Sequence, residues 1–156
     1  MPPNITAPEQ VLAQAAKHVD YEIEMLKAMT SCLSTREGSP SLIVWRRNAY
    51  LESFVLHVRN LIDFLYPPKN PKPDDMHADA FVKEPATWHI VRPAKTPLLI
   101  DAETRMNKLA AHLTYARVEL PKNWRCVDIY SDLCNVLQCF YDQLAPHRQG
   151  WFPSLK

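Results

Sequence analysis

The chain has 156 residues, with 14 prolines but only 2 glycines, and its formal net charge at pH 7 is +1. This length predicts a single domain over residues 1–156, and the scarcity of glycine argues against β-hairpin folds and excludes a glycine-rich phosphate loop. The small net charge provides no long-range field for nonspecific binding to DNA or to a membrane surface.

The apolar stretches and the N-terminal residues bear on where the protein is found. No stretch approaches the roughly 20 apolar residues that span a bilayer, and no basic segment followed by an apolar one marks a secretion signal. The sequence therefore predicts a cytoplasmic protein. The four cysteines match no zinc-binding spacing, and we interpret them as small buried hydrophobic residues in a reducing compartment. They are Cys32, Cys126, Cys134 and Cys139.

Clusters of proline divide the chain into four long segments, because proline is tolerated in loops and at the first helical turn but not inside a helix. The first predicted helix covers residues 7–34, with Thr6 as its N-cap and Val11 in its apolar stripe. The second covers residues 41–66 and is the most apolar of the four. Its apolar side chains, Trp45 among them, cover more than half of its circumference, so we predict that it lies at the centre of a bundle.

Residues 67–96 are rich in proline, and we predict a long loop that contains one short helix over residues 74–82. The third long helix is predicted over residues 97–120. Thr96 is its N-cap, and the proline that follows stands at the first helical position.

The fourth predicted helix covers residues 121–145 and turns Val127 inward with its other apolar residues. Its short connection to the third helix makes the two antiparallel neighbours. The tail, residues 146–156, carries Trp151 and Phe152, which either pack back onto the bundle or mark a surface for a partner. The predicted fold is all-α, a bundle of four long helices with a short accessory helix in a long proline-rich loop.

Basic and polar side chains follow one edge of the third predicted helix, beside its apolar face. They are Arg105, Lys108, His112 and Tyr115. Arg105 and His112 are seven positions apart, so their directions on an α-helix differ by only about 20°. Both side chains can then reach one group of the size of a phosphate, with Lys108 between them.

The spacing of Arg105 and His112 resembles the R-x(4–6)-H motif of the HEPN superfamily. The resemblance implies an all-helical bundle and a metal-independent endoribonuclease or RNA-binding module, in a toxin–antitoxin or phage-defence system. It also implies a homodimer in which two copies of the pair form one cleft, and an antitoxin or another protein as a further partner. The family often has a polar residue directly after the arginine, whereas this chain has Met106 there and Asn107 one position later.

The residue types fit this chemistry without reference to the family. Cleavage of RNA by its own 2′-hydroxyl needs a group that titrates near neutral pH, and His112 is such a group. It also needs positive charge around the phosphate, for which Arg105 offers a planar fork of donors. Lys108 adds a point charge and Tyr115 a stacking or hydrogen-bonding group for the substrate. The reaction requires no metal and no cofactor.

Four residues of the second predicted helix could support the site, as could Asn107 from the third. His57, Arg59 and Asn60 would lie beside the cleft if the two helices pack together, and Glu52 could orient Arg105 through an ion pair. For His57 we favour a different interpretation, a buried histidine whose hydrogen bonds are satisfied by neighbouring polar groups.

Other interpretations of these patterns remain open at this point. The edge of the third helix is also typical of an ordinary solvated flank, and the chain is then a noncatalytic helical interaction module, which predicts that Arg105 points into solvent. We interpret the acidic residues around His77, between residues 74 and 79, as a solvated loop and not a cation site, because calcium loops need a glycine.

Overall fold

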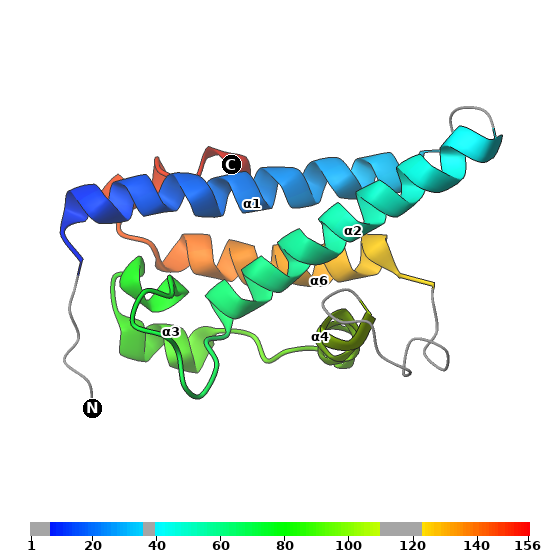
Figure 1. The fold of residues 1–156 in the computed structure, drawn as a ribbon. Helices are drawn as coiled ribbons and strands as arrows, with labels where there is room; N and C mark the ends of the chain where they lie inside the picture. Colours follow the sequence, from blue (N-terminus) through cyan, green and yellow to red (C-terminus); the bar gives the residue numbers. More distant parts are fainter. Residues whose placement is uncertain (1–6, 36–39, 110–122) are drawn as a thin grey trace.

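The structure is a computed structural model that describes residues 7–35, 40–109 and 123–156, with the backbone alone at 40–43 and 107–109. The described residues form helices and no strand, which confirms the all-α prediction (Figure 1). The longer helices are α1 (Glu9–Ser34), α2 (Pro40–Leu65), α4 (Pro97–Leu109) and α6 (Cys126–Gln143). The short ones are η1 (Ala78–Ala80), α3 (Pro85–Val91), α7 (Pro146–Gln149) and η2 (Pro153–Leu155). Of the described helices, none combines the length and the apolar character needed to cross a membrane.

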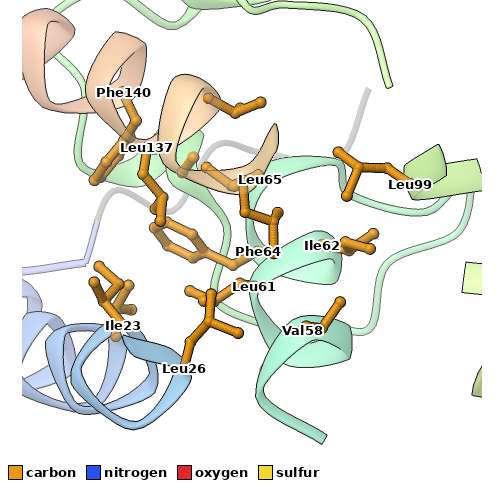
Figure 2. Packing of buried hydrophobic residues seen from close by; sticks show 14 of the residues in the cluster. Ile23, Leu26, Val58, Leu61, Ile62, Phe64, Leu65, Leu99, Leu137 and Phe140 are labelled. Atoms are coloured by element: carbon orange, nitrogen blue, oxygen red, sulfur yellow. The ribbon is translucent and has the colours of Figure 1, made fainter. Parts of the chain in front are cut away.

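The core lies where α1, α2, α4 and α6 meet. In Figure 1, α1 and α6 run alongside each other and α2 crosses them obliquely. Figure 2 shows their side chains interdigitating, with Leu26 from α1, Leu61 from α2, Leu99 from α4 and Leu137 from α6. The buried residues of α1 recur every three or four positions, as the sequence predicts, because that spacing keeps them on one face. Val11 is an exception and is exposed.

The prediction that the whole second helix lies at the centre is wrong for its first turns. Trp45 is 75% exposed, and every residue from 44 to 49 is exposed. These turns extend past the helices beside them in Figure 1. Tyr50 and Leu51 are partly buried against the core, and the fully buried residues of α2 begin at Phe54.

The predicted loop over residues 67–96 contains more helix than expected. The predicted short helix over 74–82 is reduced to the 3₁₀ turn η1, and α3 follows it unpredicted. Pro85 stands in the first turn of α3, where a missing N–H costs nothing. Trp88 is fully buried and lies edge-on to Phe140, with their ring centroids 6.0 Å apart. Helix α3 is therefore held by one core side chain, and it is too short for periodicity to reveal it.

Helix α4 begins as predicted, with Thr96 as its N-cap: the backbone N–H of Leu99 donates to Oγ1 of Thr96 over 3.2 Å. The Thr96 hydroxyl also donates to the carboxylate of Asp132, which connects the start of α4 to α6. The rest of the predicted helix, residues 110–120, lies outside the described residues, as does the cap predicted at Thr6.

Helix α6 begins later than the predicted residue 121, since residues 123–125 are not helical and the helix starts at Cys126. The prediction that Val127 points inward is also wrong, because Val127 is exposed and Ile129 is buried. Residues two positions apart on an α-helix differ by about 200° in direction, so only one of Val127 and Ile129 can face the core. The four cysteines are all free and half-buried, and burial raises the pKa of the Cys126, Cys134 and Cys139 thiols.

The tail packs back onto the helices, which settles one of the two alternatives for Phe152. This side chain is fully buried and lies edge-on to Phe81 and Phe140. The backbone N–H and the hydroxyl of Ser154 both donate to the carboxylate of Asp20 on α1, each over 3.0 Å. The C-terminal segment is therefore part of the core.

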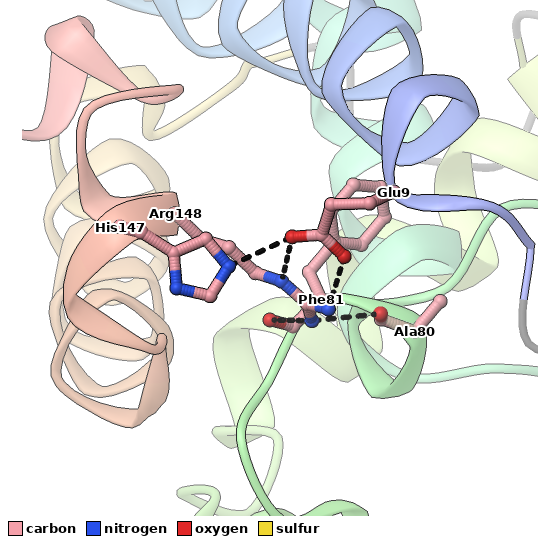
Figure 3. A network of polar contacts seen from close by, with 5 residues as sticks. All are labelled: Glu9, Ala80, Phe81, His147 and Arg148. Carbon is pink, nitrogen blue, oxygen red and sulfur yellow. Dashed lines mark hydrogen bonds and ion pairs between the residues drawn. The ribbon is translucent and has the colours of Figure 1, made fainter.

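An ion-pair network joins the start of α1 to this C-terminal segment (Figure 3). The guanidinium of Arg148 donates to both carboxylate oxygens of Glu9, over 3.0 and 2.8 Å, and also to the carbonyl oxygens of Ala80 and Phe81. His147 contacts the same carboxylate over 2.8 Å. These hydrogen bonds, from Arg148 first and then from His147, lower the pKa of Glu9 to about 2.

The shifted pKa of Glu9 predicts a loss of stability in acid. Between the ordinary pKa of 4.5 and about 2, the unfolded chain binds a proton at Glu9 and the folded chain does not, so stability falls as the pH falls through this window. Above pH 4.5 Glu9 is ionised in both states, and the ion pairs of its carboxylate contribute their full stabilisation. We expect wild type to resist urea better than Glu9→Gln at neutral pH, and the difference to shrink steadily as the pH is lowered toward 3. Glu24→Gln, at an exposed site on the same helix, is the control. A difference between wild type and Glu9→Gln that does not change with pH would contradict the network.

Candidate functional site

Arg105, the first residue of the predicted catalytic pair, lies on α4 and is only 8% exposed. Its Nη2 donates to the carbonyl oxygen of Asn123 over 2.7 Å. Its guanidinium carbon lies 4.3 Å from the ring centroid of Trp124, which is a cation–π contact, and Nη1 lies 3.5 Å from a carboxylate oxygen of Asp101 one turn earlier. Arg105 therefore holds the segment before α6 against α4.

The buried face of α4 determines where Arg105 points. Ala102 and Met106 are buried beside it, so Arg105 lies at the edge of the core. An ion pair between Lys95 and Glu103, with 2.6 Å between Nζ and Oε2, and the cap at Thr96 fix the first turns of the helix. Helix α4 thus presents the guanidinium to the segment at residues 123–125.

The electrostatic surroundings of Cys126 connect Arg105 with α2. Burial raises the pKa of the Cys126 thiol, while the positive charges of Arg47 and Arg105 act in the opposite direction. The first turn of α6 therefore lies within the electric field of one arginine from α2 and one from α4.

The partners predicted for Arg105 on its own helix lie at or beyond the last described turn of α4. His112 and Tyr115 lie outside the described residues, and for Asn107 and Lys108 the structure describes the backbone of α4 alone. The pairing of Arg105 with His112 stays a prediction.

The supporting residues predicted on α2 lie in two different environments. His57 is buried, and its Nδ1 is 2.6 Å from Oε2 of Glu22 on α1. Asn60 donates to the same oxygen over 3.1 Å, and Tyr21 lies edge-on to the imidazole. His57 is thus a buried histidine with polar partners.

Glu52 and Arg59 do not meet Arg105 in the described part of the chain. Glu52 is exposed and forms no ion pair with a described residue. Arg59 pairs with Asp63 one turn later, with 3.9 Å between Nε and Oδ2. The predicted support of Arg105 by Glu52 is absent among these residues.

Arg59 and Asn60 line a cavity of about 510 Å³ between α2, α4 and the segment before η1. Asp63, Asp75, Glu103 and His77 also line it. Burial raises the pKa of Asp63, and the two neighbouring carboxylates add to this effect. Both ring nitrogens of His77 are shielded from solvent and have no partner among the described residues. Within those residues, no three side chains that bind metals converge on one point.

Two contacts were missed in the sequence because they join residues far apart in the chain. Glu22 lies on the polar edge of α1, beside its apolar stripe. A polar residue at such a place is too common to predict that it pairs with His57. Trp124, just before α6, is half-buried against the core and covers the guanidinium of Arg105. No local pattern relates residue 105 to residues 123 and 124.

Comparison with known proteins adds no relative. No protein-family model matches the chain, and no curated protein or solved structure shows significant similarity to it. The HEPN resemblance therefore depends on the motif and on the helical character of the chain.

Proposed function

We propose that the protein is a HEPN-like RNA-binding protein with metal-independent endoribonuclease activity, built on a bundle of four long helices and acting as a homodimer in the cytoplasm. The observation that supports this best is the fixed position of Arg105 on α4, seven residues before His112. The proposal includes a place in a toxin–antitoxin or phage-defence system, with an antitoxin as protein partner.

The contacts of Arg105 change its role within this proposal. Because its guanidinium holds Asn123 and Trp124, we assign it the positioning of the site and a fixed positive charge behind the phosphate. His112 exchanges the proton. The 2′-oxygen of the ribose bonds to phosphorus as the bond to the 5′-oxygen breaks. Neutral His112 takes the proton of the 2′-hydroxyl while water protonates the leaving 5′-oxygen, or protonated His112 gives its proton to the leaving 5′-oxygen while water takes the 2′ proton. Lys108 and Tyr115 contact the RNA.

The test is cleavage of single-stranded RNA in the presence of EDTA. We expect wild type to cleave, and His112→Ala to be slower by about 10²–10⁴-fold, the usual contribution of one general acid or base. His18→Ala, at an exposed histidine on α1, is the matched control and should cleave like wild type. Intact RNA with wild type, or equal cleavage by wild type and His112→Ala, would refute the catalytic proposal.

The contacts of Arg105 support a second candidate, a noncatalytic helical protein-interaction module. The expectation that Arg105 of such a module points into solvent is wrong, because the side chain is 8% exposed. The module stays a candidate because a guanidinium engaged within the fold resembles a structural arginine more than a substrate-binding one. The burial of Phe152 excludes this side chain from the surface of such a module. The second candidate predicts that RNA stays intact in the EDTA assay.

A further inference from the structure

The first described turns of α2 expose a large aromatic side chain. Trp45 is 75% exposed, and its neighbours Val44 and Asn48 are exposed as well. Tryptophan is normally largely buried, since its side chain has one of the largest apolar surfaces of any residue. Tryptophan is enriched at interfaces, so this exposed ring is a candidate for contact with a partner.

The charges next to Trp45 indicate what this surface binds. Arg46 and Arg47 are both exposed, and neither forms an ion pair with a described residue. Successive positions on a helix are about 100° apart, so Trp45, Arg46 and Arg47 follow one another around the helix. An extended ligand that follows the surface of these turns would contact an aromatic ring and then two positive charges.

Positive charge also lies toward the start of α6. Arg47 on α2 and Arg105 on α4 both act electrostatically on Cys126, the first residue of α6. Arg125, directly before α6, has a side chain that is two-thirds exposed and pairs with Asp128. Arg125 thus adds a further positive charge near the start of α6, on which Arg47 and Arg105 also act.

We propose that Trp45, Arg46 and Arg47 form a binding surface for single-stranded RNA, with a base stacked on Trp45 and phosphates bound by the two arginines. The inference rests on the proposed function and adds where the substrate strand is held. Single strands offer the unstacked bases that aromatic side chains bind, whereas the bases of a duplex are stacked on each other. A second copy of the chain fits less well, because Trp45 of one copy would face adjacent pairs of exposed arginines, which repel each other.

The experiment measures binding of a labelled single-stranded RNA by fluorescence anisotropy, with His112→Ala as the parent protein so that the RNA stays intact. We expect Trp45→Ala to weaken binding by about 5- to 100-fold, the usual effect of removing one stacking aromatic residue. Arg46→Ala/Arg47→Ala should weaken binding and lower the slope of log K against log[salt] by about 1.4, because two phosphate contacts are lost. A duplex of the same length should bind more weakly than the single strand.

Matched variants separate this surface from nonspecific effects. Tyr21→Ala removes an exposed aromatic residue from α1, and Lys17→Ala/Lys83→Ala removes two exposed positive charges elsewhere; both should bind RNA like the parent protein. Thermal unfolding verifies that each variant is folded, as expected for exposed positions.

The outcomes distinguish this surface from the proposed function. Binding by the parent protein with unchanged affinity in Trp45→Ala and Arg46→Ala/Arg47→Ala would overturn the surface and leave the proposed function standing. Unchanged RNA binding together with a loss of self-association in Trp45→Ala would also overturn it and show an interface between copies. Absence of RNA binding in the parent protein would overturn both.

Discussion

Replacing Phe152 with alanine is expected to lower the free energy of unfolding by about 3–5 kcal/mol, the usual cost of deleting a fully buried aromatic side chain. Phe152 is fully buried directly before η2 and lies edge-on to Phe81 and Phe140, with ring centroids 5.9 and 5.3 Å away. Alanine leaves a cavity beside these two rings. Urea unfolding of the full chain measures the change.

An exposed apolar residue provides the control for Phe152. Ile90→Ala on α3 removes a side chain that is almost fully in solvent and should change the free energy of unfolding by less than about 0.5 kcal/mol. If Phe152→Ala and Ile90→Ala unfolded at the same urea concentration, the packing of the tail onto the core would be refuted.

Arg105→Ala is expected to cost about 2–4 kcal/mol of stability. It removes a charged hydrogen bond to the carbonyl oxygen of Asn123 and a shielded cation–π contact with Trp124, and contacts of these kinds contribute about 1.5–3 and 0.5–2 kcal/mol. Arg105→Lys should cost less than Arg105→Ala, because the ammonium group keeps the positive charge. Some cost remains, because lysine lacks the planar fork of donors. Arg125→Ala, at an exposed pair with Asp128, is the control and should change stability by less than about 1 kcal/mol.

The same variants separate a positioning role of Arg105 from direct contact with the substrate. If Arg105 positions the site, Arg105→Lys loses stability but keeps cleavage within about tenfold of wild type at a temperature where both are folded, a change of about 1.4 kcal/mol in the barrier. A loss of cleavage by 10²-fold or more, with little change in stability, would contradict the assigned role.

Local patterns in the sequence were sufficient for the parts of the fold that depend on neighbouring residues. The buried face of α1 follows from its apolar spacing, and the start of α4 follows from Thr96 and the proline after it. The positions of the prolines also separated the long helices, because none of these helices has a proline beyond its first turn.

Parts of the fold that depend on distant residues could not be predicted in this way. Trp45 has the spacing of a core residue but is exposed. Val127 is exposed as well, because Ile129, two positions later, faces the core instead. Helix α3 has a single buried anchor, Trp88, so its seven residues show no periodicity.

The candidate site shows the same limit. The motif indicates that Arg105 matters, but only the fold shows that its guanidinium binds Asn123 and Trp124. These contacts span up to 19 positions and depend on how α6 returns toward α4. The exposed surface at Trp45 could not be recognised either, since exposure depends on which neighbours are missing.

The antiparallel bridge between Val82 and Leu144, the hydrogen bond from Lys83 to Gln143, and the ion pair of Glu9 with Arg148 all join early parts of the chain to late ones. During synthesis, α1 and α2 can pair as soon as both have left the ribosome, because they are adjacent in the chain. The aromatic cluster of Phe64, Phe81 and Phe140 stays open to solvent until Phe152 has been made. A nascent chain that stalls before this residue therefore presents an uncovered apolar surface, and we expect such truncated products to be preferred substrates of chaperones and proteases.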